Sequence, residues 1–280
     1  MRCAHPVLAM IIGVALACTL LPAQAGHAHG RTAAIKPPTL GSYYLALGDS
    51  LAVGYQPDTP SATPAVWTSG YVYQFQAMLA KVSPIELQNL GVRGECTNTL
   101  IKGGLDASCT TKVVDTPSQL AQAVAFLKDH PGRVNPITVD IGGNNLNSNA
   151  LAFFIDTPAQ QKVLLTKLFG GMVKDWTTIF GTLRQACPTC NIIAVNQYNP
   201  YPKGALKTDL APVFRTYSGL LAKVAKATHV KLADVYTPFV GHEILYTWIS
   251  VRDIHATNTG YTVMAEAVAK ASGYPIHIVQ

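Results

Sequence analysis

The chain has 280 residues, of which 49% are hydrophobic and 13% are charged. This composition excludes an intrinsically disordered protein, because so many apolar side chains can bury a sizeable core. The formal net charge is +6, but the basic residues are scattered and form no patch interleaved with aromatic side chains, as nucleic-acid binding would need. We therefore expect one globular domain, a monomer with no nucleic-acid partner.

The N-terminal stretch, residues 1–25, is typical of a secretory signal peptide. A positive charge near its start precedes an almost wholly apolar run over residues 7–21, and Ala23-Gln24-Ala25 puts small residues at both positions that signal peptidase recognises. We expect cleavage after Ala25 and secretion of the mature protein into the periplasm or the medium.

Two kinds of membrane anchor are the alternatives to release. A spanning helix needs roughly 20 apolar residues, and the run over residues 7–21 is shorter than that. A lipid on Cys18 ranks below simple secretion, because Ala15 stands three positions before it where lipoproteins usually carry Leu. We therefore expect no stable membrane anchor.

Four cysteines follow the signal peptide, an even number that suits disulfides in an oxidising compartment. Three pairings are open, and we predict the nearest-neighbour one, Cys96 with Cys109 and Cys187 with Cys190. The stretch Cys-Pro-Thr-Cys is also compatible with a redox pair or half of a zinc site. Redox motifs usually open a helix, whereas this one lies between a predicted helix and a predicted strand. No second Cys-x-x-Cys or His pair completes a metal site, so we predict no metal.

From residue 43 onward, short apolar runs alternate with longer helical patterns. The predicted domain covers residues 43–280, after a loose N-terminal arm over residues 26–42. Strands are expected at 43–48, 85–90, 136–141, 191–197 and 230–236, and helices at 70–82, 117–130, 158–186, 211–228 and 258–272. Continuous apolar strands are typical of a parallel sheet that helices cover on both faces. The pattern therefore predicts a three-layer α/β/α sandwich with a five-stranded parallel sheet.

Polar and glycine-rich clusters follow four of the five predicted strands. They are Gly48-Asp49-Ser50, residues 91–97, residues 142–145 and residues 253–261. In such sheets, ligands bind beyond the carboxyl ends of the strands. The four clusters are therefore expected to meet at one site.

The residue types in these clusters suit acyl transfer. Ser50 is the candidate nucleophile and His255 the candidate base, since a serine hydroxyl needs a base to take its proton. The backbone N–H groups of Ser50 and Gly94 and the side-chain NH₂ of Asn144 are candidate donors to a developing oxyanion. The alternative interpretation makes Asp49 and Ser50 ordinary helix-capping residues.

Taken in order, the clusters resemble the four motif blocks of the SGNH (GDSL) hydrolase superfamily and span most of the mature chain. The resemblance implies a flavodoxin-like fold and metal-free, cofactor-free hydrolysis of carboxylic esters. It also implies the roles given above for Ser50, Gly94, Asn144 and His255. The blocks are Gly48-Asp49-Ser50-Leu51, Asn89-x-Gly91-x-x-Gly94, Gly142-Gly143-Asn144-Asn145 and Asp253-x-His255.

Two positions depart from the family pattern. Arg252 stands where the family usually has Asp, three residues before the histidine, and Asp253 is only two residues before it. Either Asp253 reaches the imidazole, which is the alternative we favour, or a backbone carbonyl near Arg252 orients the ring and the enzyme works as a dyad. Asn145 replaces a frequent Asp and is expected to be structural.

Other polar residues receive structural interpretations. We expect Asp49 to hold the turn, Asp140 to cap neighbouring backbone and Asn258 to fix the histidine loop. Asp234 is expected to support the end of the last strand, and the alternative role for it is that of the missing acid. Two apolar stretches, residues 151–154 and 239–249, are candidates for either an acyl-binding wall or core packing.

The function predicted from the sequence is a secreted serine ester hydrolase of the carboxylesterase or lipase type. Its substrate would be a small ester, a lipid or an acetylated sugar. A carbohydrate O-deacetylase with the same site and a non-catalytic secreted binding protein are the alternatives. A binding protein would have no chemical need to retain Ser50, Gly94, Asn144 and His255 together.

Overall fold

The protein is described by a computed structural model that covers residues 37–57, 68–106, 109, 116–149, 157–206 and 208–277. These residues belong to one unit, Pro37–Gln280. The predicted signal peptide, most of the predicted arm and the apolar stretch 151–154 lie outside the described residues.

The described elements alternate between strands and helices along the chain. The strands are β1 (Tyr43–Gly48), β2 (Glu86–Asn89), β3 (Val134–Asp140), β4 (Ile192–Val195) and β5 (Lys231–Ala233). The helices are α1 (Ser50–Val53), α2 (Tyr71–Ala80), α3 (Thr97–Lys102), α4 (Gln119–Asp129), α5 (Gly143–Asn147), α7 (Pro158–Ala186), α8 (Ala211–Ala227), α9 (Tyr236–Phe239), α10 (Glu243–Tyr246) and α11 (Asn258–Ser272), with a 3₁₀ turn at Ile249–Val251.

The five strands form one parallel sheet in the order β2-β1-β3-β4-β5. Gly48 at the end of β1 pairs with Asp140 at the end of β3. The loops that follow these two strands therefore leave the same edge of the sheet side by side, which brings Ser50 and Asn144 together.

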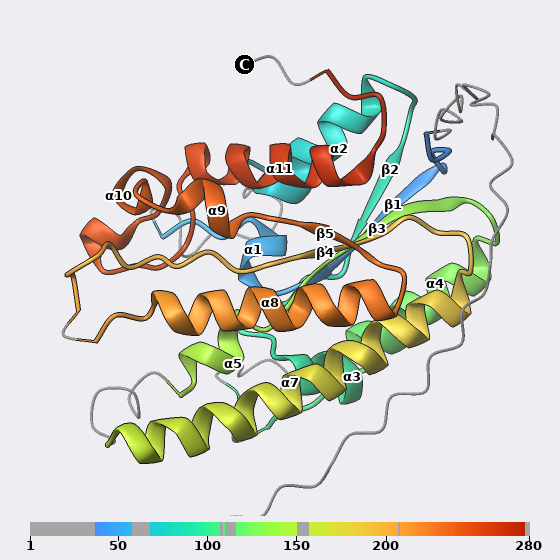
Figure 1. Cartoon of the computed structure of the whole chain (residues 1–280). Coiled ribbons are helices and arrows are strands. Elements are labelled where there is room, and N and C mark those ends of the chain that lie inside the picture. Colours follow the sequence, from blue (N-terminus) through green and yellow to red (C-terminus); the bar gives the residue numbers. More distant parts are fainter. Residues whose placement is uncertain are drawn as a thin grey trace, which may run out of the picture. The chain divides into compact units, whose positions relative to one another are not determined.

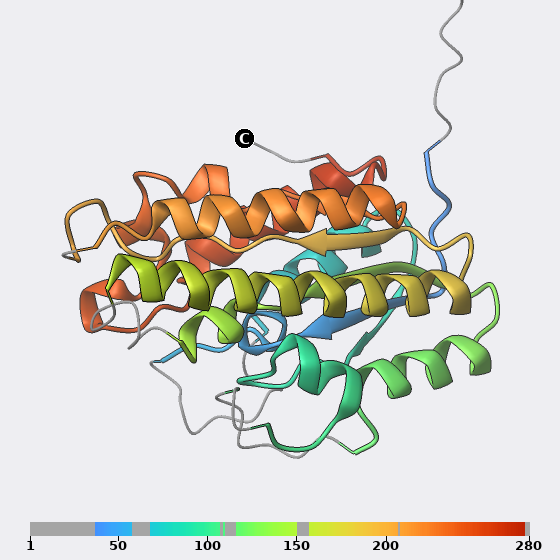
Figure 2. The same cartoon turned by 60° about the horizontal axis from the view of Figure 1, so that its bottom comes forward.

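Helices cover both faces of the sheet, as Figures 1 and 2 show: α2 and α11 on one side, and α3, α4, α7 and α8 on the other. Side chains alternate along each strand. In β1, Leu45 and Leu47 pack against the side of α4 and α7, while Tyr44 and Ala46 pack against the side of α2 and α11. The predicted three-layer α/β/α sandwich is confirmed.

The predicted strands and long helices are present within a few residues of their expected bounds. The helix predicted at 117–130 begins slightly later, at Gln119, because Ser118 is the N-cap of α4 and its hydroxyl accepts from Ala121 N–H. The end of the predicted arm is tied to the start of β3. Gly41 N–H donates to the Asn135 carbonyl at 2.8 Å.

The cysteine sulfurs lie at disulfide distance in the nearest-neighbour pairs, 2.01 Å for Cys96 and Cys109 and 1.96 Å for Cys187 and Cys190. The second pair lies between the end of α7 and the start of β4. In the first pair, Cys96 ends the loop after β2 and Cys109 follows α3. Cys109 Sγ lies 3.3 Å from the carbonyl oxygen of Gly94, so this pair clamps the loop that carries a predicted oxyanion donor.

Candidate active site

Ser50 lies at a sharp junction between β1 and α1. Gly48 makes the junction possible, because its φ is +154° and a Cβ there would lie 2.4 Å from the Asp140 carbonyl oxygen. Asp49 is the N-cap of α1, with Oδ1 accepting from Leu51 N–H at 3.0 Å. Ser50 is the first residue of the helix, where a backbone N–H has no partner inside the helix. The capping interpretation therefore holds for Asp49, and it leaves Ser50 available for chemistry.

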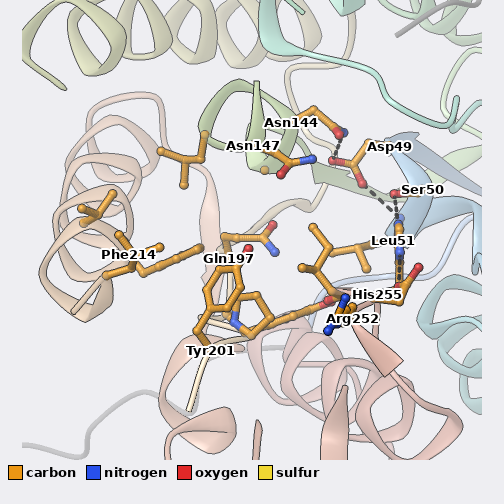
Figure 3. Close-up of a pocket in the computed structure, with 18 residues that line it drawn as sticks. Asp49, Ser50, Leu51, Asn144, Asn147, Gln197, Tyr201, Phe214, Arg252 and His255 are labelled. Atoms are coloured by element: carbon orange, nitrogen blue, oxygen red, sulfur yellow. Dashed lines mark hydrogen bonds and ion pairs between the residues drawn. The ribbon is translucent and has the colours of Figure 1, made fainter. Parts of the chain in front are cut away.

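Ser50, His255 and Asp253 form a continuous hydrogen-bonded chain. Ser50 Oγ lies 2.8 Å from His255 Nε2, and His255 Nδ1 lies 2.6 Å from Asp253 Oδ1. A carboxylate can only accept, so it holds the imidazole proton on Nδ1 and leaves Nε2 to accept the serine proton. Figure 3 shows Ser50 and His255 at one end of a pocket.

Asp253 reaches the imidazole ring of His255 although it is only two residues before His255 in the sequence. Its Oδ1 also accepts from His255 backbone N–H at 2.8 Å. This hydrogen bond closes a local turn of the kind that Asp side chains favour. The preceding residue, Arg252, has a φ of +65°, which redirects the chain just before the turn. The sequence left two alternatives for the group that contacts His255 Nδ1. In the structure this group is the Asp253 carboxylate and not a backbone carbonyl.

Hydrogen bonds from neighbouring segments fix the histidine loop. Trp248 N–H donates to the His255 carbonyl at 2.9 Å, and Asp253 N–H donates to the Trp248 carbonyl at 3.2 Å. Gln56 links this loop to α11, because it accepts from Trp248 Nε1 and donates to Asn258 Oδ1, both at 2.7 Å. Asn258 therefore fixes the loop, through Gln56.

One aromatic and one basic residue border this hydrogen-bonded chain. Arg93 belongs to the polar cluster at residues 91–97, whereas Tyr55 belongs to none of the predicted clusters. The Tyr55 ring meets the His255 ring edge-on at 4.4 Å, and the Arg93 guanidinium stacks over Tyr55 at 3.9 Å. Burial alone would raise the pKa of Asp253, but its hydrogen bond to His255 and the charges of His255 and Arg93 lower it below its usual value. The lowered pKa favours the ionised form of Asp253 beside the imidazole.

Asp234 serves a different part of the fold. Its Oδ1 accepts from Asn196 Nδ2 at 2.9 Å and from the N–H groups of Tyr236 and Thr237 at the start of α9. Burial alone would raise the pKa of Asp234, but these hydrogen bonds lower it. The structure places Asp234 as a cap beyond β5 and does not bring it to His255.

Asn144 links the clusters that follow β1, β2 and β3. Its Nδ2 lies 3.0 Å from Asp49 Oδ2 and 3.0 Å from the Glu95 carbonyl oxygen. Gly94, in the left-handed conformation with φ +79°, directly precedes Glu95. Asn144 and Gly94 are thus brought to the Ser50 side of the sheet. Because an amide has only two protons, an oxyanion has to share or replace one of the two acceptors of Asn144.

Asn145 plays the structural role expected of it. Its Oδ1 accepts from Thr97 N–H at 3.1 Å, and its Nδ2 donates to Thr97 Oγ1 at 3.3 Å. This pair joins α5 to the start of α3.

Two buried carboxyl groups lie beneath the site. Burial raises the pKa of Asp49 to about 6, against hydrogen bonds from Leu51 and Asn144. Burial, and then the charge of Asp49, raise the pKa of Asp140 well above its usual value. The prediction that Asp140 caps backbone is wrong, because its Oδ2 has no hydrogen-bond partner among the described residues. Burial therefore favours the protonated form of Asp140.

A pocket of about 420 Å³ opens at Ser50 and His255. Figure 3 shows Gln197 in its middle, with Tyr201 and Phe214 toward the far end and Arg252 near His255. Gln197 follows β4, the one strand end at which the sequence analysis named no polar cluster. The sequence feature that could have revealed Gln197 is the polar pair Asn196-Gln197 directly after an apolar strand.

Comparisons with known proteins agree with this arrangement. The model of the GDSL-like lipase/acylhydrolase family matches residues 46–263. No curated protein matches the sequence. Among the described residues, none of the helices has the length and apolar character that crossing a membrane would take.

Solved structures share the fold at low sequence identity. A lipase, Lip_vut3 from a goat rumen metagenome, has a TM-score of 0.60 and 21% identity over 84% of this chain and 98% of its own. Axe2, an acetylxylan esterase from Geobacillus stearothermophilus, has a TM-score of 0.55 and 15% identity over 86% and 98%. An extracellular lipase from Streptomyces rimosus has a TM-score of 0.55 and 15% identity over 82% and 100%. The family match spans most of the chain and all four motif blocks, and the chain therefore belongs to the GDSL-like lipase/acylhydrolase family.

Proposed function

We propose that the protein is a secreted carboxylic ester hydrolase that works through an acyl-enzyme on Ser50. The observation that carries the proposal is the hydrogen-bonded chain from Ser50 Oγ through His255 to Asp253, with links of 2.8 and 2.6 Å. Membership of a lipase/acylhydrolase family supports ester hydrolysis in general. The cysteine pairs at bonding distance support an oxidising compartment.

In the first half of the reaction, Ser50 Oγ attacks the ester carbonyl carbon while His255 Nε2 takes the hydroxyl proton. The carbonyl oxygen becomes an oxyanion beside the Ser50 N–H, with Gly94 N–H and Asn144 Nδ2 as further donors. When the tetrahedral intermediate collapses, the carbon–alkoxy bond breaks. The leaving alcohol receives the proton from His255, and the acyl group stays on Ser50.

In the second half, His255 takes a proton from water, and the resulting hydroxide attacks the acyl-enzyme. Collapse of this intermediate returns the proton to Ser50 Oγ and releases the carboxylic acid. Asp253 stabilises the imidazolium that forms twice in the cycle. The serine proton thus leaves with the alcohol, and a proton from water restores the Ser50 hydroxyl.

Hydrolysis of a p-nitrophenyl ester series from acetate to decanoate tests this proposal. We expect turnover by the purified protein, loss of turnover in Ser50→Ala, and unchanged turnover in Ser83→Ala, which removes the hydroxyl of an exposed serine. A folded protein that is inert toward every ester, acetylated sugars included, would support the non-catalytic binding protein. Acetyl release from xylan without turnover of longer esters would support the carbohydrate O-deacetylase.

A further inference from the structure

Gln197 is a buried polar side chain that the proposed catalytic steps do not use. It is 8% exposed, and its Oε1 is buried without a hydrogen-bond partner among the described residues. Folded proteins seldom leave a buried polar atom unpaired, because it loses its water and gains nothing in return. Such an atom in the wall of a pocket indicates that a bound ligand supplies the partner.

A second buried glutamine shows how this fold satisfies the same side chain elsewhere. Gln119 accepts from Gly48 N–H at 3.0 Å and donates to the Gly48 carbonyl at 2.9 Å and to Glu95 Oε2 at 3.0 Å. Gln119 is thus fully engaged in holding the end of β1. Gln197 has no such bonds within the described residues, and it lines the pocket.

Ordered parts of the fold flank Gln197 on both sides. Gln197 follows β4 directly, and the preceding Asn196 is tied to the end of β5 by hydrogen bonds to Asp234 and to Val235 N–H. On its other side lies Gly143, where a Cβ would come within 2.9 Å of Gln197 Oε1. Gly143 is the neighbour of Asn144, so the carboxamide lies beside the expected oxyanion donor.

The chemistry of the carboxamide selects its partner. A buried Oε1 needs a donor, and neither the carbonyl oxygen of an ester nor an alkyl chain can donate. A hydroxyl group donates and accepts, so it matches both ends of a carboxamide. Asn147, a second carboxamide, also lines the pocket, while Leu210, Val213 and Phe214 give it an apolar end. At about 420 Å³, the pocket has the size of a ligand site.

We propose that Gln197 is a specificity-determining residue that hydrogen-bonds a free hydroxyl of the substrate, so that the enzyme prefers partial esters of polyols to esters of simple alcohols. This inference rests on the proposed ester hydrolysis. The apolar end of the pocket would take the hydrocarbon part of the same substrate.

Glycerol monobutyrate and n-propyl butyrate test this proposal, since they share the acyl group and differ in the hydroxyls. We expect wild type to favour glycerol monobutyrate in kcat/KM. Gln197→Leu should reduce that preference by at least about fivefold, the size of one neutral hydrogen bond, through the monobutyrate alone. Gln197→Glu, which keeps an acceptor, should restore part of it. Gln185→Leu, at an exposed glutamine near the end of α7, is the matched control and should change nothing.

Thermal unfolding separates this role from a structural one. Because Gln197→Leu removes a buried group that has no partner in the described parts of the fold, Tm should stay the same or rise. A marked fall in Tm, or an equal loss on both butyrates, would overturn the inference. So would an unchanged preference in Gln197→Leu. If wild type hydrolyses p-nitrophenyl butyrate yet shows no preference for the hydroxyl ester, the inference fails while the proposed function stands. If it hydrolyses no ester, both fail.

Discussion

Replacing Asp253 by Asn tests how much the catalytic chain depends on a carboxylate that comes from an unusual position. Asp253 Oδ1 accepts from both the ring Nδ1 and the backbone N–H of His255, at 2.6 and 2.8 Å. An Asn can offer its carbonyl oxygen to both donors at once. The imidazole should therefore keep its orientation and tautomer in Asp253→Asn, and only the negative charge is lost.

The size of that loss follows from the geometry. When His255 takes the serine proton, opposite charges face each other across the 2.6 Å contact. Two unit charges about 4 Å apart attract each other by about 4 kcal/mol at an effective dielectric constant of 20. We therefore expect a loss of about 10³ in kcat, since about 1.4 kcal/mol corresponds to a factor of ten. In the trypsin-type triad, where the amide stabilises the wrong tautomer, the loss is about 10⁴.

Steady-state hydrolysis of p-nitrophenyl butyrate at pH 8 measures this effect. We expect kcat to fall in Asp253→Asn with little change in KM, and Asp253→Ala to lose about tenfold more because the ring also loses its anchor. Asp234→Asn, which alters a carboxylate at a neighbouring strand end, should keep wild-type kcat. A loss of less than about tenfold in Asp253→Asn would refute the reasoning and favour a dyad.

Three further outcomes follow from the surroundings of the site. Because burial raises the pKa of Asp49 from 3.8 to about 6, ionisation of Asp49 should cost about 3 kcal/mol of stability as pH rises through this interval. Urea titrations should show Asp49→Asn gaining about that much on wild type between pH 4 and pH 7, and a constant difference would contradict the burial argument. Asp49→Asn should also lower kcat about tenfold or more, because its NH₂ would face the NH₂ of Asn144; an unchanged kcat would separate Asp49 from catalysis. Replacing Cys96 and Cys109 by Ser should lower the free energy of unfolding by about 3 kcal/mol and also reduce kcat, because the loop that carries Gly94 loses its clamp. Replacing Cys187 and Cys190 by Ser should leave kcat unchanged. Calorimetry and esterase assays on both variants test this, and equal effects on kcat would exclude the clamp.

The sequence predicted the fold because local signals and packing agree. Strands such as residues 43–48 are apolar runs, and Thr157-Pro158 marks the start of the long helix α7. The polar clusters after the strands predicted which residues would meet, since the carboxyl ends of parallel strands share one edge. The family match confirmed the resemblance that these clusters suggested.

The details that depend on long-range contacts were not predictable from the sequence. Whether Asp253 reaches His255 depends on the left-handed conformation of Arg252, and no sequence pattern predicts that conformation. Asp140 was predicted to be a backbone cap, and only the three-dimensional structure shows that its Oδ2, near Asp49, has no partner within the described part of the chain. Gln197 was missed because a single glutamine after a strand does not reveal whether its carboxamide will find a partner.

Covalent labelling with an alkyl fluorophosphonate, followed by mass spectrometry of the digested protein, tests the central claim most directly. Such a reagent phosphonylates a serine whose hydroxyl is activated by a neighbouring base. We expect a single adduct on Ser50 that removes esterase activity in proportion to labelling, with no adduct in Ser50→Ala and slow labelling in His255→Ala. An adduct on a different serine, or full esterase activity in a protein labelled at Ser50, would contradict the account.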